Sequence, residues 1–209
     1  MNKLVKAALF LAASAVPLAS MAMPEAYIEG VHYKATPTRL ATSDDTKVEV
    51  VEVFSYACPH CFHFEPLVEK WAAALPDNVK FVRVPAIFRE SWLQLAKLYY
   101  TAEATGDLER LHPLIFKAIH VDKKRLNTEA QILDFVADQG IDRDAFEKMM
   151  GSMTVQAKVK KALAISQQSG ITGVPSMIVN GQYSTDAPMA GSMEEMLKTV
   201  DFLVQKQSK

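Results

Sequence analysis

The chain has 209 residues and a formal net charge of −1, and 49% of its residues are hydrophobic. This apolar content is enough for a packed core and argues against an intrinsically disordered protein. The near-zero charge gives no sign of the basic surface that nucleic-acid binding needs. With only two cysteines, the chain is not a small scaffold held together by several disulfides. We expect one domain, alone or with a sizeable insertion.

The first 22 residues have the pattern of a secretory signal peptide. Lys3 and Lys6 precede an apolar run over residues 7–16, and small residues follow up to Ala22. The run is shorter than the roughly 20 apolar residues that a membrane-spanning helix needs. We therefore expect export and cleavage after Ala22, with an uncleaved membrane anchor as the alternative.

The mature chain begins with strand and helix signals in alternation. We expect a short edge strand at residues 31–35 and then a valine-rich strand at residues 48–54, whose few polar positions indicate burial on both faces. Residues 59–75 predict a helix, because Pro59 suits the first helical position and apolar residues recur at helical spacing. Residues 79–84 predict the next strand.

From residue 91 to residue 168 the strand signals disappear and helix signals follow one another. Glycines after residues 105 and 139 mark helix ends, and Thr128 with Gln131 forms a capping-box pattern. The expected helices span residues 91–105, 108–120, 128–139, 142–150 and 152–168.

Strand signals return near the C-terminus. Residues 176–179 predict a strand, and Asn180-Gly181 is a strong hairpin turn that leads into a partner strand at residues 182–184. Ser192 and Glu195 form a second capping-box pattern, which predicts a final helix to about residue 207.

Without the helical block, the order is strand–helix–strand followed by strand–strand–helix. This α/β order resembles the thioredoxin fold. We expect residues 23–90 and 169–209 to form that domain and residues 91–168 to form a helical insertion domain within it.

Cys58 and Cys61 lie two residues apart where the valine-rich strand leads into a helix. The spacing allows their sulfurs to bond across one helical turn, and the helix start points unpaired N–H groups at Cys58. This environment favours the thiolate of Cys58 and lowers its pKa, whereas Cys61 should be buried and less reactive. His60 adds either a hydrogen-bond donor beside the thiolate or only a solvated side chain. The pattern predicts a redox-active cysteine pair.

Other uses of the two cysteines fit the residues less well. A zinc site needs four ligands and the chain has no second cysteine pair, so we predict no metal site. Attachment of a c-type haem requires histidine directly after the second cysteine, and Phe62 occupies that position. A structural disulfide would close a very small loop and stabilise little.

These residues together resemble the DsbA family of periplasmic dithiol oxidases. The resemblance rests on Cys58-Pro-His-Cys61 after Glu52-Val-Phe-Ser55, on the helical block, and on the segment at residues 173–181, Gly-Val-Pro-Ser-Met-Ile-Val-Asn-Gly. It implies an α/β thioredoxin fold with a helical insertion, a Cys58–Cys61 disulfide that is donated to clients, and no bound cofactor.

The resemblance also implies roles for individual residues. Cys58 is the nucleophile, Cys61 its buried partner and His60 a group that stabilises the thiolate. A cis proline at Val174-Pro175 lies against the cysteines, and these two residues and Pro59 contact the client chain.

Glu52 is a further candidate for catalysis, because it falls on an inward-facing position of its strand. A buried carboxylate is costly unless it is paired or its pKa rises. The resemblance implies that Glu52 assists proton transfer to Cys61. Glu65 and Arg83 match a nearby charge pair of the family, although the residues alone are equally consistent with an ordinary surface ion pair.

The function expected from these residues is that of a periplasmic oxidase for reduced, unfolded exported proteins. The resemblance implies reoxidation by a DsbB-like membrane quinone reductase, and we expect a monomer that binds no nucleic acid. A reductase or isomerase on the same fold is one alternative. A metal carrier that uses Cys58, His60 and Cys61 is another.

Overall fold

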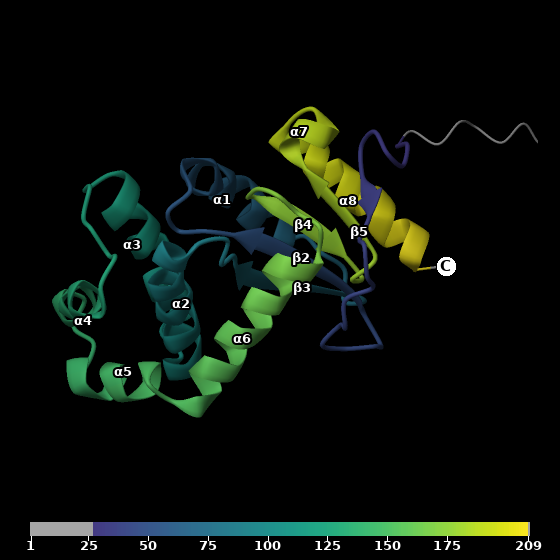
Figure 1. The fold of residues 1–209 in the computed structure, drawn as a ribbon. Coiled ribbons are helices and arrows are strands. Elements are labelled where there is room, and N and C mark those ends of the chain that lie inside the picture. The colour runs from purple at the N-terminus through teal and green to yellow at the C-terminus, as the bar shows by residue number, and fades with distance from the viewer. Residues whose placement is uncertain (1–26, 209) are drawn as a thin grey trace, which may run out of the picture.

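The computed structural model describes residues 27–208, which form one five-stranded sheet with helices on both faces (Figure 1). The predicted signal peptide at residues 1–22 lies outside the described residues. The strands are β1 (Lys34–Ala35), β2 (Val48–Phe54), β3 (Val79–Pro85), β4 (Ser176–Val179) and β5 (Tyr183–Asp186), in the order β1-β5-β4-β2-β3. β2 pairs parallel to β3 and antiparallel to β4, which places it inside the sheet.

The helices fall into two groups in space (Figure 1). α1 (Pro59–Ala72) follows β2, and α7 (Ala187–Ala190) and α8 (Met193–Gln207) follow β5. Between β3 and β4 lie α2 (Leu93–Thr105), α3 (Leu108–His120), α4 (Glu129–Asp138), α5 (Arg143–Met150) and α6 (Met153–Gln168). The α/β class and the thioredoxin order with a helical insertion are confirmed by this arrangement.

β2 separates two hydrophobic cores, because alternate side chains of a strand point to opposite faces of the sheet. Val48 and Val50 pack in the core formed with α1 and α8. Val51 and Val53 pack in the larger core, to which the helices between β3 and β4 contribute. All seven residues of β2 are buried, as its valine-rich sequence predicts.

Several predicted boundaries shift for local reasons. The edge strand is only Lys34–Ala35, because Gly30 has a positive φ of 84° and the backbone turns through residues 28–33. The first helix ends at Ala72 rather than near residue 75, since the N–H of Ala74 bonds to the Trp71 carbonyl in a tighter turn before Pro76.

Three further differences concern the start of the helical block and the hairpin. A short 3₁₀ helix (Glu90–Trp92) precedes α2, whose predicted start was residue 91. β5 extends past the predicted residue 184 to Asp186. The Asp186 side chain then accepts a hydrogen bond from the Met189 N–H and begins α7, a four-residue helix too short for a periodic sequence pattern.

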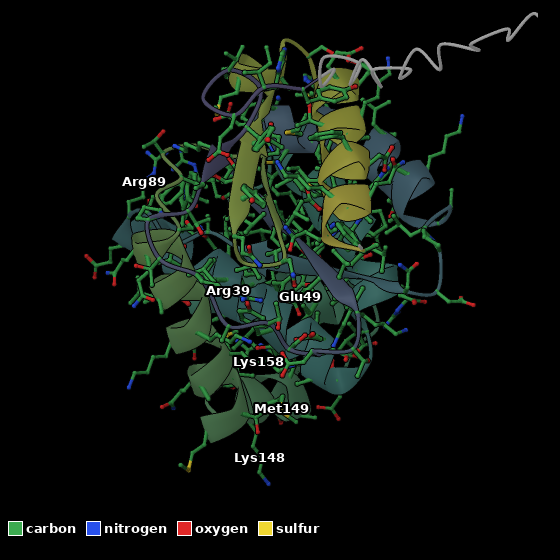
Figure 2. The ribbon with its side chains drawn as sticks, turned by 90° about the vertical axis from the view of Figure 1, so that its right-hand side faces the viewer. Arg39, Glu49, Arg89, Lys148, Met149 and Lys158 are labelled. Atoms are coloured by element: carbon green, nitrogen blue, oxygen red, sulfur yellow. The ribbon has the colours of Figure 1, made fainter. Side chains whose placement is uncertain are left out.

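A cavity of about 350 Å³ lies between the sheet and α6, away from the cysteine motif. Glu49 of β2 and Lys158 of α6 line it, and Figure 2 shows both residues on one side of the molecule. Glu49 is buried and accepts a hydrogen bond of 2.9 Å from the Ser43 N–H. Neither cysteine lines this cavity, but Arg83, which belongs to the charge group described below, does.

Candidate redox site

The cysteine pair lies at the junction between β2 and α1. Cys58 is the residue before the helix, and Pro59 takes the first helical position, where a missing N–H costs no hydrogen bond. Cys58 is half-buried, whereas the side chain of Cys61 has no exposed surface. Both are free thiols, so the structure represents the dithiol form of the pair. Only Cys58 is therefore accessible to another molecule.

The two sulfurs differ strongly in their ionisation. A hydrogen bond from the Cys61 thiol is the largest cause that lowers the pKa of Cys58, to about 6, and the backbone N–H groups of Cys61 and His60 and the charge of His60 add to it. Partial burial of Cys58 opposes this effect. Burial raises the pKa of Cys61 well above its ordinary value, and the adjacent Cys58 raises it further. The pair thus holds one stable thiolate and one stable thiol.

The loop before β4 lies against Cys58. The Val174–Pro175 peptide bond is cis, and the Cys58 Sγ atom is 3.3 Å from the Val174 carbonyl oxygen, which accepts a hydrogen bond from the thiol. Val174, Pro175 and His60 line a cavity of about 400 Å³ together with residues of the hairpin and α7. The cavity gives a second polypeptide a place to lie beside the reactive sulfur.

Glu52, Glu65 and Arg83 form a buried group of charges beneath the motif. The Arg83 Nε atom donates to Glu52 at 3.1 Å, and its Nη2 atom donates to Glu65 at 2.6 Å. Glu52 has no exposed surface and Glu65 is 7% exposed, so these residues are not the ordinary surface ion pair that the sequence left open. Burial raises the pKa of Glu52 to about 8, with a further contribution from the Glu65 charge, although Arg83 opposes both. Glu52 can therefore carry a proton at neutral pH.

Glu52 interacts electrostatically with the cysteine pair, because its charge contributes to the raised pKa of Cys61. Glu52 and Arg83 are register partners in the parallel pairing of β2 with β3. The structure therefore brings together Glu52, Cys58, His60 and Cys61, which the sequence predicted as a catalytic set, and places Val174 and Pro175 beside them.

Sequence reasoning missed the roles of Tyr56, His112 and His120 next to this site. His112 and His120 of α3 both contact Tyr56, which lies two residues before Cys58. The His120 Nε2–H donates to the Tyr56 carbonyl at 2.8 Å, and the His120 ring stacks on Phe62 with ring centroids 5.0 Å apart. The sequence signal for His112 was its position within the apolar stripe of the helix at residues 108–120. A histidine at such a position is more often a hydrogen-bonded core residue than a functional one.

Titration of the reduced protein tests the unequal ionisation of the two cysteines. We expect the thiolate absorbance at 240 nm to rise with a midpoint near pH 6, because one sulfur ionises far below its ordinary pKa of 9. Cys61→Ala removes the hydrogen bond that contributes most, so the midpoint should move up by about one unit or more. A midpoint near pH 9 in the unmodified protein would contradict the described geometry.

The comparisons with known proteins agree with this site. Residues 49–200 match the DSBA-like thioredoxin domain. The thiol:disulfide interchange protein DsbA of Azotobacter vinelandii is 40% identical over 210 residues, which cover 99% of this chain and 98% of that protein. DsbA of Pseudomonas aeruginosa strain PAO1 is 36% identical over 207 residues, with 99% and 97% covered.

Solved structures give the same result. The crystal structure of Pseudomonas aeruginosa DsbA superposes with a TM-score of 0.83 at 37% identity and covers 87% of this chain and 95% of that one. DsbA from Xylella fastidiosa superposes with a TM-score of 0.81 at 29% identity, with 87% and 98% covered. With its paired cysteines at the start of α1, the chain belongs to the DSBA-like thioredoxin family and is a thiol:disulfide oxidoreductase of the DsbA type.

Proposed function

We propose that this protein donates a Cys58–Cys61 disulfide to newly exported proteins in the periplasm. The observation that carries the proposal is the unequal ionisation of the two cysteines. A thiolate at Cys58 stabilises the reduced protein, so the disulfide gives up its bond readily. A pKa of about 6 for Cys58 at pH 7 corresponds to about 1.4 kcal/mol, or about 30 mV for a two-electron couple.

The proposed reaction has two exchange steps. A client thiolate attacks the Cys58 sulfur, a client–Cys58 disulfide forms, and the electron pair of the Cys58–Cys61 bond goes to Cys61. Cys61 then takes up a proton, since burial disfavours its anion, and the protonated carboxyl of Glu52 is the proposed source. A second client thiolate attacks the client sulfur and expels Cys58 as a stable thiolate. The client is oxidised by two electrons and the cysteine pair is reduced.

The residues around Cys58 have proposed roles in holding the client. Pro59, Val174 and Pro175 border the exposed sulfur, and His60 lines the same cavity of about 400 Å³ as Val174 and Pro175. An extended client segment in this cavity would place its cysteine against Cys58. His60 also favours the Cys58 thiolate through its backbone N–H and its charge. No bound cofactor or metal is required for either exchange step.

The proposed setting follows from the family and from the N-terminal sequence. Residues 1–22 are the proposed signal peptide, with cleavage after Ala22. No helix within residues 27–208 is long and apolar enough to cross a bilayer. We further propose that the protein acts as a monomer and that a DsbB-like membrane quinone reductase reoxidises the cysteine pair. Residues 91–168 remain the proposed insertion domain between the two parts of the thioredoxin domain, 23–90 and 169–209.

Equilibration against glutathione tests the direction of electron flow. We expect the cysteine pair to be more oxidising than cytosolic thioredoxin, whose potential is about −270 mV, and to oxidise a reduced client peptide stoichiometrically. A potential at or below that of thioredoxin would favour the reductase or isomerase alternative. Stoichiometric metal retained by the purified protein, together with a failure to oxidise any dithiol, would favour the metal carrier.

A further inference from the structure

His112 of α3 lies inside the protein between the helical block and the cysteine motif. Its side chain is about 5% exposed, and its two ring nitrogens face different partners. The Nδ1 atom is 2.6 Å from the Tyr56 hydroxyl. The Nε2 atom is 3.1 Å from the Glu65 Oε1 atom, but the buried Nε2 has no hydrogen-bond partner among the described residues. The contact with Glu65 is therefore electrostatic, and it becomes an ion pair when His112 is protonated.

The Glu65 contact joins His112 to the charges beneath the cysteines. Glu65 Oε1 also accepts from Arg83, and Arg83 donates to Glu52 on β2. The Glu52 charge in turn acts on Cys61. His112 and Cys61 are thus the two ends of one series of charged and titratable groups, which α3, α1, β3 and β2 contribute.

The charge of this series depends on the proton of Glu52. While Glu52 is protonated, Arg83 balances the carboxylate of Glu65. Once Glu52 loses its proton, two carboxylates face one guanidinium in a buried region, and the excess negative charge is costly there. The Oε1 atom of Glu52 and the Oε2 atom of Glu65 are buried without a hydrogen-bond partner among the described residues, so local hydrogen bonds do not disperse that charge.

The other groups around His112 cannot supply the missing positive charge. Burial raises the pKa of Tyr56 and of Tyr99, which therefore remain neutral phenols. Glu69, Glu109 and His112 line a cavity of about 560 Å³ together with Arg83, and the two glutamates are acidic. Both glutamates are exposed, so this cavity is the side from which a solvent proton would approach His112.

We propose that His112 is a positioning residue for the cysteine pair, which takes up a proton from solvent when Glu52 gives its proton to Cys61. The inference rests on the proposed function for the order of the steps. The proton balance is complete: Glu52 loses a proton to Cys61, His112 gains one from solvent, and His112 releases it when solvent reprotonates Glu52. His112 touches neither the client nor the sulfurs and acts through Glu65 and Arg83.

Titration of the Glu52 carboxyl by ¹³C NMR in the reduced protein tests this inference. In His112→Gln the compensating charge is lost, so we expect the pKa of Glu52 to rise by about one unit. The matched control is His63→Gln, which removes an exposed imidazole from α1 and should leave the titration of Glu52 unchanged. The pH profile of the glutathione equilibrium should change in His112→Gln over the same range and remain unchanged in His63→Gln.

A reciprocal measurement keeps the test decisive even where His112→Gln folds poorly. In the unmodified protein, we expect the imidazole resonances of His112 to show an inflection over the pH range in which Glu52 ionises, because the charge of Glu52 acts on His112 through Glu65 and Arg83. Glu52→Gln should abolish that inflection, because coupling between two sites is mutual. The proposal is overturned where the His112 resonances are the same in the unmodified protein and in Glu52→Gln, or where a folded His112→Gln changes thermal stability alone.

These outcomes are separate from those of the proposed function. A potential like that of thioredoxin would reverse the proposed direction of electron flow and leave the coupling between Glu52 and His112 measurable. An oxidising potential with independent titration of Glu52 and His112 would retain the proposed function and remove the role of His112.

Discussion

Replacing Cys58 with serine should reduce the oxidation of a dithiol peptide by more than about a thousandfold, to the uncatalysed level. The reason is structural as well as chemical. Cys58 is the accessible sulfur and has a pKa lowered to about 6, whereas Cys61 has no exposed surface and a strongly raised pKa. Cys61 alone cannot be reached by a client or ionise to react with one. The measurement is the rate at which the peptide forms its disulfide, followed by mass spectrometry, with the oxidised unmodified protein and with Cys58→Ser, which cannot form the internal disulfide.

A second variant identifies which sulfur forms the bond to the client. Cys61→Ser also lacks the internal disulfide, but it keeps the exposed Cys58. Incubated with a peptide disulfide, it should accumulate a mixed disulfide at Cys58, and Cys58→Ser should form none. Ala57→Ser places a hydroxyl on the exposed neighbouring residue and should retain activity within about twofold. A mixed disulfide at Cys61 in the folded Cys58→Ser protein would contradict the assignment.

Local sequence patterns were enough to predict most elements of this fold. The capping box at Thr128 and Gln131 is present as predicted, with both reciprocal hydrogen bonds. The Asn180-Gly181 turn joins β4 and β5, and both residues have positive φ, as that turn type requires. These features depend on residues a few positions apart, so the sequence contains all the information that they need. The burial of Glu52 follows from strand alternation in the same way.

The partners of Glu52 could not be derived from such patterns. Its pairing with Arg83 depends on the register of β2 against β3, and the contact of Arg83 with Glu65 depends on how α1 packs on the sheet. The position of His112 depends on how the helices between β3 and β4 dock onto α1, which periodicity within one helix does not describe. The cis Val174–Pro175 bond came from the family resemblance, since the residues alone indicated only the start of a strand.

Removing the charge of Arg83 should have the largest effect on stability. Arg83→Met keeps much of the side-chain volume but leaves Glu52 and Glu65 without their shared cation. Breaking a buried ion pair by removing one partner costs about 3–5 kcal/mol, because the remaining charge is buried and uncompensated. For a chain of this length, the expected fall in melting temperature is on the order of 10 °C.

The loss should depend on pH in a direction that the carboxyl groups determine. The pKa of Glu52 is already raised from 4.5 to about 8 in the folded protein, and removing Arg83 takes away an interaction that lowers it. A carboxyl whose pKa is higher in the folded state loses stability as the pH rises from its unfolded value to its folded value. Below pH 8 Glu52 is protonated in both folded proteins, so it adds no difference between them. Above pH 8 Glu52 ionises in the unmodified protein but stays protonated in Arg83→Met, so the difference in stability between the two proteins should grow there.

Denaturant unfolding of the reduced protein at about pH 6 and about pH 9.5, on either side of the Glu52 pKa, measures both effects, provided that the m-values stay equal. Arg143→Met is the matched control, because Arg143 is 42% exposed and forms surface ion pairs with Asp134 and Glu147. It should change the free energy of unfolding by no more than about 0.5 kcal/mol at either pH. Adding Glu52→Gln to Arg83→Met should recover part of the loss at the higher pH, because the group whose ionisation is disfavoured in the folded protein is then absent. Equal losses at the two pH values would show that Arg83 does not compensate the ionised carboxylate of Glu52.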